Sequence, residues 1–165
     1  MTPLPIRRLL EEKCDRPASE QVVLWVKRRL FLKRRWEGVA EDGTAFAFDL
    51  EARLADGCVI HRTEAADYVV RQESEPVYEI PAPTAALAAL VGWRIGNLHF
   101  PIEIRPGAVR VTRDPLVKET IDKEGWACEE IETVFKPLKI PPEVLGLVPG
   151  QGTSQGQGEA NASGA

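Results

Sequence analysis

One of the two histidines of this 165-residue chain lies in a segment whose pattern predicts the direction of its side chain. Residues 96–104 read Gly-Asn-Leu-His-Phe-Pro-Ile-Glu-Ile, an alternation typical of a β-strand with one buried face. The apolar members would form that buried face: Phe100, Ile102 and Ile104. His99 and Glu103 would then share the outer face. Neutral imidazole binds nickel, copper or zinc, so the segment predicts a metal site at His99, with Glu103 as a second ligand or as the group that orients the ring.

The residues around His99 resemble those of a known family, the UreE urease accessory proteins. The matching residues, which keep the family's spacing, are Gly96, Asn97, His99, Pro101, Pro106, Gly107 and Asp114. The resemblance covers roughly residues 20–138. Two departures stand out. The histidines that flank the aspartate in the family are replaced here by Arg113 and Pro115, and the His-rich tail of many members is replaced by residues 151–165, which contain no histidine.

The resemblance implies a carrier rather than an enzyme. Such a protein binds nickel at a homodimer interface and delivers it to the urease maturation complex, which contains the urease accessory GTPase and apo-urease. His99 transfers as the metal ligand shared at the dimer axis, because an isologous interface brings the same residue of both protomers together. We expect zinc or copper to bind in vitro as well, since imidazole ligands favour copper on intrinsic grounds. A second interpretation is a non-metal adaptor or scaffold protein of the same complex, because the auxiliary histidines are missing.

Composition excludes several other classes of protein. Hydrophobic residues make up 44% of the chain, enough for one moderate core or two small ones, and the formal net charge is only −4. We therefore expect neither nucleic acid nor a membrane as a partner. The three cysteines are odd in number and far apart, and no signal peptide or long apolar run is visible, which predicts a cytoplasmic protein. No catalytic triad or phosphate-binding loop is present in the sequence.

The pattern predicts an α+β protein with two domains. Residues 1–20 read as a flexible lead-in, and residues 21–75 as a small all-β domain of short strands and turns, of a type that binds partners or peptides. Residues 76–138 read as a ferredoxin-like βαββαβ domain that carries the metal site. Residues 139–165 are rich in glycine, proline and small polar residues, which predicts a disordered tail.

Helix signals support the order of elements in the second domain. Thr84 is the predicted N-cap of a helix over residues 85–95, and Gly96 is its predicted C-cap. Asp114 followed by a proline predicts the start of a second helix, which Gly125 ends. A role as N-cap is sufficient to explain Asp114, although the family's metal motif has an aspartate there.

Two further groups of residues have competing explanations. Cys58 and His61 form a Cys-x-x-His pair, but no second pair completes a zinc site, so we interpret both as structural. Residues 27–35 hold six basic side chains around an apolar triplet. These could contact RNA or an acidic protein, or could form a solvated strand face. The resemblance favours a protein partner, with the candidate contact residues Arg28, Arg29, Arg34 and Arg35.

Overall fold

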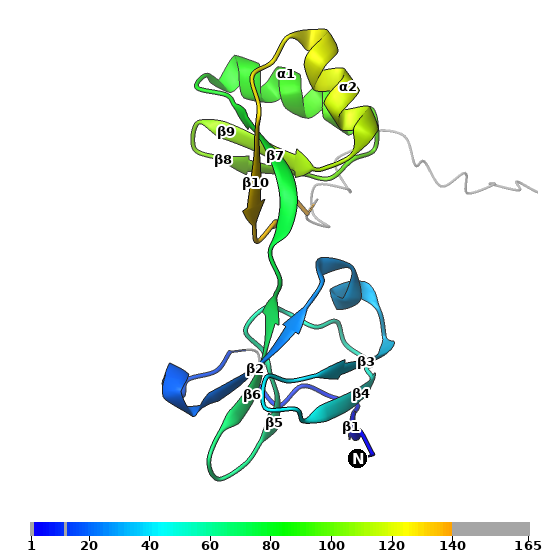
Figure 1. Cartoon of the computed structure of the whole chain (residues 1–165), viewed down its shortest axis with the longest axis vertical. Coiled ribbons are helices and arrows are strands. Elements are labelled where there is room, and N and C mark those ends of the chain that lie inside the picture. The colour runs from blue at the N-terminus through cyan, green and yellow to red at the C-terminus, as the bar shows by residue number, and fades with distance from the viewer. Residues whose placement is uncertain (1, 12, 140–165) are drawn as a thin grey trace, which may run out of the picture.

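The structure is a computed structural model that describes residues 2–11 and 13–139, and it has an α+β fold with three sheets and few helices (Figure 1). The predicted disordered tail lies outside the described residues, apart from Lys139. Within the described part of the chain, no helix is both long and apolar enough to span a bilayer.

The first half contains two three-stranded sheets with the orders β1-β4-β3 and β2-β6-β5. Its strands are β1 (Leu4–Ile6), β2 (Gln21–Val26), β3 (Arg35–Val39), β4 (Ala45–Asp49), β5 (Val59–Arg62) and β6 (Asp67–Gln72). Two short 3₁₀ helices cover Ala18–Glu20 and Arg28–Leu32. Strand β1 pairs in parallel with β4, and β2 pairs in parallel with β6. Apolar side chains from both sheets share one core, with Leu24, Phe46 and Val70 among its most buried members.

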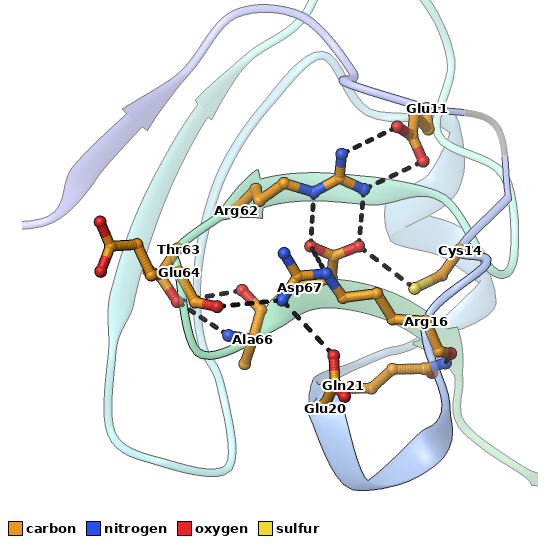
Figure 2. A network of polar contacts seen from close by, with 10 residues as sticks. All are labelled: Glu11, Cys14, Arg16, Glu20, Gln21, Arg62, Thr63, Glu64, Ala66 and Asp67. Carbon is orange, nitrogen blue, oxygen red and sulfur yellow. Dashed lines mark hydrogen bonds and ion pairs between the residues drawn. The ribbon is translucent and has the colours of Figure 1, made fainter.

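Residues 2–11 and 13–20 are part of this fold, so the prediction of a flexible lead-in was wrong. Besides the β1 pairing, a polar network ties them to the β5–β6 hairpin (Figure 2). The fully buried carboxylate of Asp67 accepts hydrogen bonds from Arg62 Nε and Nη2 at 2.6 and 2.7 Å and from the Cys14 thiol at 3.4 Å. It also lies 3.4 Å from Arg16 Nε, and Glu11 pairs with Arg62 at 3.0 Å. Glu11 and Arg62 are 51 positions apart in the sequence, and Cys14 and Asp67 are 53 apart, so local patterns cannot reveal these contacts.

The second half is one four-stranded antiparallel sheet with two helices. Its elements are β7 (Glu75–Pro81), α1 (Ala85–Gly96), β8 (Ile102–Arg105), β9 (Ala108–Thr112), α2 (Pro115–Glu124) and β10 (Glu129–Thr133). The sheet order is β10-β7-β9-β8. Both helices pack on the same face of the sheet, since Val91 and Ile95 of α1 share a core with Val117 and Ile121 of α2 (Figure 1).

Local hydrogen bonds explain why both helices begin where they do. The Thr84 hydroxyl accepts a hydrogen bond from Leu87 N, and Asp114 Oδ1 accepts one from Leu116 N, which confirms both predicted N-caps. Gly125 ends α2 in the left-handed conformation, with φ of +69°. Gly96, by contrast, is the last helical residue of α1, and the chain makes its left-handed turn further on.

The two halves lie end to end, and residues 73–74 are all that separates strand β6 from strand β7 (Figure 1). Arg28 pairs with Glu75 across this junction, with Nε 2.5 Å from Oε1 and Nη2 3.0 Å from Oε2. A groove of about 470 Å³ lies beside that ion pair, lined by residues 27–29 and 73–76.

Candidate metal site

His99 lies in a turn between α1 and β8, not on a strand as the alternation predicted. The helix ends at Gly96, and the turn is closed by two backbone hydrogen bonds, from Leu98 N to Ile95 O at 3.0 Å and from His99 N to Gly96 O at 2.9 Å. Strand β8 begins only at Ile102. The imidazole is exposed, as expected, but the cause is the turn rather than the outer face of a strand.

The backbone of His99 is in the left-handed region, with φ of +62°. It is the one non-glycine residue with positive φ among the described residues. This conformation costs an L-residue about 1 kcal/mol, although histidine tolerates it better than bulky or β-branched residues. Strained residues of this kind tend to occur at functional sites, because the surrounding structure holds them there for a purpose.

Helix α1 leads toward His99 with an apolar outer face. Its inner face packs into the core through Val91 and Ile95, while Trp93 and Leu90 on the outer face are 60% and 45% exposed. Ala86 and Ala89 are exposed beside them, so the outer face carries small and apolar side chains at helical spacing. An exposed apolar stripe next to an exposed imidazole is an arrangement suited to contact with another protein surface.

Glu103 faces away from the helix side of the sheet and is only 6% exposed, so the prediction that it lies on an outer face with His99 was wrong. Its Oε2 accepts a hydrogen bond from Lys136 N at 3.2 Å and lies 3.9 Å from Arg110 Nη1. Arg110 in turn pairs with Glu79 at 2.6 Å. The Glu103 carboxylate is therefore engaged within the fold, away from the turn that holds the imidazole.

The error has a physical cause, because both faces of β8 are partly covered. Ile102 packs against the helix-side core as expected, but Ile104 on the same face is 50% exposed at the strand's end. The opposite face is partly covered by the chain that follows β10, where Lys136 N donates to Glu103 Oε2 at 3.2 Å. A strand with two partly covered faces does not alternate cleanly.

At the position where the family has a histidine before the aspartate, Arg113 pairs with Glu130 on β10 at 2.8 Å. Asp114 is occupied as the N-cap of α2, and Pro115 is the first residue of that helix. These three residues therefore support the position of α2 and β10 and offer no free ligand pair. The interpretation of Asp114 as a capping residue is confirmed.

Cys58 belongs to the core of the first half, and His61 is half-buried against that core. Cys58 is fully buried, and burial raises the pKa of its thiol. His61 packs against aromatic rings, with its centroid 6.0 Å from that of Phe46 and 5.5 Å from that of Tyr68. Over residues 2–11 and 13–139, no group of three or more His, Cys, Asp or Glu side chains is placed to hold a metal ion. A tight site at His99 would therefore need ligands from a second protomer.

Of the basic residues of 27–35, Arg28 and Arg29 lie on the 3₁₀ helix, whereas Arg35 is the first residue of β3. Arg28 pairs with Glu75, and its guanidinium lies 5.0 Å from the centroid of the Phe135 ring. Arg34 donates to Leu50 O at 2.9 Å, and Arg35 pairs with Asp49 at 2.9 Å while remaining 82% exposed. Arg29 is exposed. The four candidate arginines thus differ in their accessibility to a partner protein.

Comparison with known proteins relates most of the chain to one group of proteins. The sequence model of the family described as "UreE urease accessory protein, C-terminal domain" matches residues 75–160, more than half of the chain. Residues of the chain are 30% identical over 131 positions to the urease accessory protein UreE of Beijerinckia indica, covering 73% of this chain and 70% of that protein. The protein of the same name from Cereibacter sphaeroides is also 30% identical, over 83% of this chain and 74% of its own length. That of Chelativorans sp. is 29% identical over 64% of this chain and 68% of its own length.

Proposed function

Because this chain belongs to the UreE family of urease accessory proteins, we propose that it is a nickel carrier whose metal site is formed by the His99 pair of a homodimer. The observation that carries the proposal is the exposed His99 imidazole, held in a left-handed turn at the end of a helix with an apolar outer face. The βαββαβ order and the 4-1-3-2 arrangement of the sheet support a ferredoxin-like module as the metal-binding half.

The outer face of α1 is the proposed dimer interface. Trp93 and Leu90 are the large apolar side chains on it, and buried tryptophans are frequent sources of binding energy at interfaces. In an isologous contact across this face, the turns that follow the two helices approach the two-fold axis. Two His99 imidazoles then meet one nickel ion there, and the remaining coordination positions are left to water or to groups of a receiving protein.

Such a site is suited to transfer rather than to retention. A metal with few protein ligands keeps open positions, through which ligands from the urease accessory GTPase and then apo-urease can replace the imidazoles. The protein acts in this scheme as a cytoplasmic carrier without catalytic activity of its own. Zinc and copper should bind the same imidazoles in vitro, and copper more tightly, because the divalent series places copper above nickel for nitrogen ligands.

The metal site is tested by titrating the protein with nickel in a calorimeter. We expect about one tight nickel ion per dimer, from the symmetry of the interface. His99→Ala should weaken binding by more than about a hundredfold, because even groups that only orient a metal ligand contribute roughly 10- to 100-fold. His61→Gln is the matched control, since His61 packs among aromatic rings in the other half and should leave nickel binding unchanged. Tight binding that persists in His99→Ala would refute the site.

The interface is tested by sedimentation of Trp93→Ser. We expect this variant to be a monomer that retains its fold and loses tight nickel binding, although His99 itself is intact. Trp25→Ser is the matched control, because Trp25 is also half exposed but lies on β2 of the first half. A Trp93→Ser protein that remains a dimer with unaltered nickel affinity would exclude the outer face of α1 as the interface.

Partner binding is proposed for the basic stretch of residues 27–35, through Arg28, Arg29, Arg34 and Arg35. Arg29 is the best test residue, because Arg28, Arg34 and Arg35 also make contacts within the fold. Arg29→Glu should weaken binding to the urease maturation complex and reduce its dependence on salt, since attraction between exposed charges is screened within about 8 Å at physiological ionic strength. Unchanged binding and salt dependence would make the stretch an ordinary solvated surface.

A second candidate function is an adaptor that acts through the first half without metal. The absence of any three-ligand cluster in the part of the chain that the structure describes supports this candidate. One experiment distinguishes the two functions. It compares His99→Ala with the wild-type protein in their ability to support urease activation by nickel in a reconstituted complex. Full activation by His99→Ala favours the adaptor, and lost activation with intact complex binding favours the carrier.

A further inference from the structure

The chain that follows β10 touches both halves of the molecule. We call residues 134–138 the strap; in Figure 1 it runs from the end of β10 toward the junction of the halves. On the side of the first half, Phe135 O accepts a buried hydrogen bond from Gln72 Nε2 at 2.8 Å. The Phe135 ring lies under the guanidinium of Arg28, and Lys136 Nζ lies 3.1 Å from Asp56 Oδ2.

On the other side, the strap holds strand β8. Lys136 N donates to Glu103 Oε2, and Leu138 N donates to Ile102 O on the edge of β8 that β9 leaves free. Lys136 therefore contacts both halves. Its main-chain nitrogen binds Glu103 of the second half, and its side chain binds Asp56 of the first half. Strand β8 thus has β9 along one edge and the strap at the start of the other.

The turn that carries His99 has little support of its own. Two backbone hydrogen bonds close it, the imidazole is exposed, and its position depends on the elements at its two ends, α1 and β8. Ile102, the first residue of β8, is three residues beyond His99 and is the residue that Leu138 holds. Any loosening of the strap therefore removes a support from the C-terminal end of the turn.

We propose that the strap couples the first half to the metal turn, so that contacts of Gln72 and Arg28 with Phe135 slow the release of nickel from His99. This inference rests on the proposed function of His99. Through the strap, binding of a partner to Arg28 changes the rate at which His99 releases nickel. A partner carboxylate that binds Arg28 in place of Phe135 and Glu75 would weaken the contacts between the strap and β8. The turn that carries His99 would then be less well fixed, and nickel would dissociate from it faster.

The test uses the full-length protein with Gln72→Ala, which removes the buried hydrogen bond to Phe135 far from His99. One reporter is native-state hydrogen exchange of the Lys136 and Leu138 amides. These amides should exchange about tenfold faster, since a lost hydrogen bond of ordinary strength changes an opening equilibrium by about that factor. The second reporter is the rate at which nickel passes to an excess of chelator, which should rise about threefold or more.

Gln21→Ala is the matched control. Gln21 is also a glutamine of the first half, whose Nε2 donates to a main-chain carbonyl, that of Arg16 at 2.6 Å, but it has no contact with the strap. It should leave both reporters at their wild-type values. Lys136→Met provides a milder perturbation that keeps the main-chain bond to Glu103, and Lys139→Met is its control just beyond the strap.

Each outcome decides the proposal. Faster exchange at Lys136 and Leu138 together with faster nickel release supports coupling. Faster exchange without a change in nickel release overturns it, and so does unchanged exchange in Gln72→Ala. If wild-type protein binds no nickel, the proposed function fails instead. The coupling is then judged from exchange of the His99 amide, which donates to Gly96 O, and an unaltered rate there in Gln72→Ala overturns it.

Discussion

Replacing the buried Asp67 by asparagine should destabilise the first half more than the same change at an exposed aspartate of that half. Asparagine keeps the shape of the side chain but removes the charge that Arg62 and Arg16 face. It also puts an amide donor opposite the guanidinium of Arg62, which itself has only donors to offer. Glu11 remains as a partner for Arg62, so part of the network survives.

The magnitude follows from the contacts. Asp67 accepts two short hydrogen bonds from Arg62, and hydrogen bonds to charged groups contribute about 1.5 to 3 kcal/mol each. The carboxylate itself has no accessible surface, but the side chain of Arg62 is 40% exposed, so water screens and replaces part of the interaction. We therefore expect a loss of about 2 to 3 kcal/mol in the free energy of unfolding, and a melting temperature lower by about 5 to 10 °C.

The effect should depend on pH with a defined sign. The hydrogen bonds from Arg62 are the main reason that the pKa of Asp67 lies below its usual value in the folded protein. A lowered pKa contributes stability above the unfolded value of about 3.9, and this contribution is lost as the pH falls through the folded value. The difference between wild type and Asp67→Asn should thus be full at pH 7 and shrink below about pH 4.

Chemical denaturation across this pH range is the assay, and Asp49→Asn is the control. Asp49 also pairs with an arginine, Arg35, but both side chains are more than half exposed, so its replacement should leave the free energy of unfolding nearly unchanged. The reasoning is refuted if Asp67→Asn costs no more than Asp49→Asn. It is also refuted if the loss of stability in Asp67→Asn stays constant from pH 7 down to pH 3.

Three further results are expected. Asp114→Ala should lower the free energy of unfolding by about 1 kcal/mol through loss of the α2 cap, whereas Glu119→Ala in the same helix should change it little; equal effects in chemical denaturation would contradict the capping role. His99→Gly should be more stable than His99→Ala by about 1 kcal/mol, because φ of +62° suits glycine, and an equal pair of melting curves would contradict the turn. Cys58 should react with a thiol reagent only on unfolding, and rapid labelling of native protein would contradict its burial.

The sequence was a reliable guide wherever a structure is decided within a few residues. The caps of both helices at Thr84 and Asp114 depend on hydrogen bonds that span three residues and two, and both were predicted correctly. The end of α2 at Gly125 was equally local. The exposure of His99 was also predicted, but the alternation pattern assigned it to a strand, because the left-handed position is occupied by histidine and not by glycine.

Prediction failed wherever burial depends on chain that is distant in sequence. Glu103 is covered by residues that lie 33 positions later, and no pattern within β8 announces them. The lead-in is held by Asp67, 53 positions after Cys14. The basic stretch was read as one surface, although Arg28 is drawn into the junction by Glu75 and Phe135. To predict each of these three contacts, one must know which strands and helices pack together. The local sequence around each residue does not contain that information.

The attachment of the first residues to the β5–β6 hairpin has a consequence for synthesis. Strand β1 has its partner at residues 46–48, β2 has its partner at 67–72, and the carboxylate that binds Cys14 belongs to residue 67. The first half of a nascent chain therefore cannot complete its two sheets until nearly all of that half has left the ribosome. Strand pairings this distant in sequence also form slowly. We expect the apolar side chains of β2 and β4 to remain accessible to chaperones during that interval.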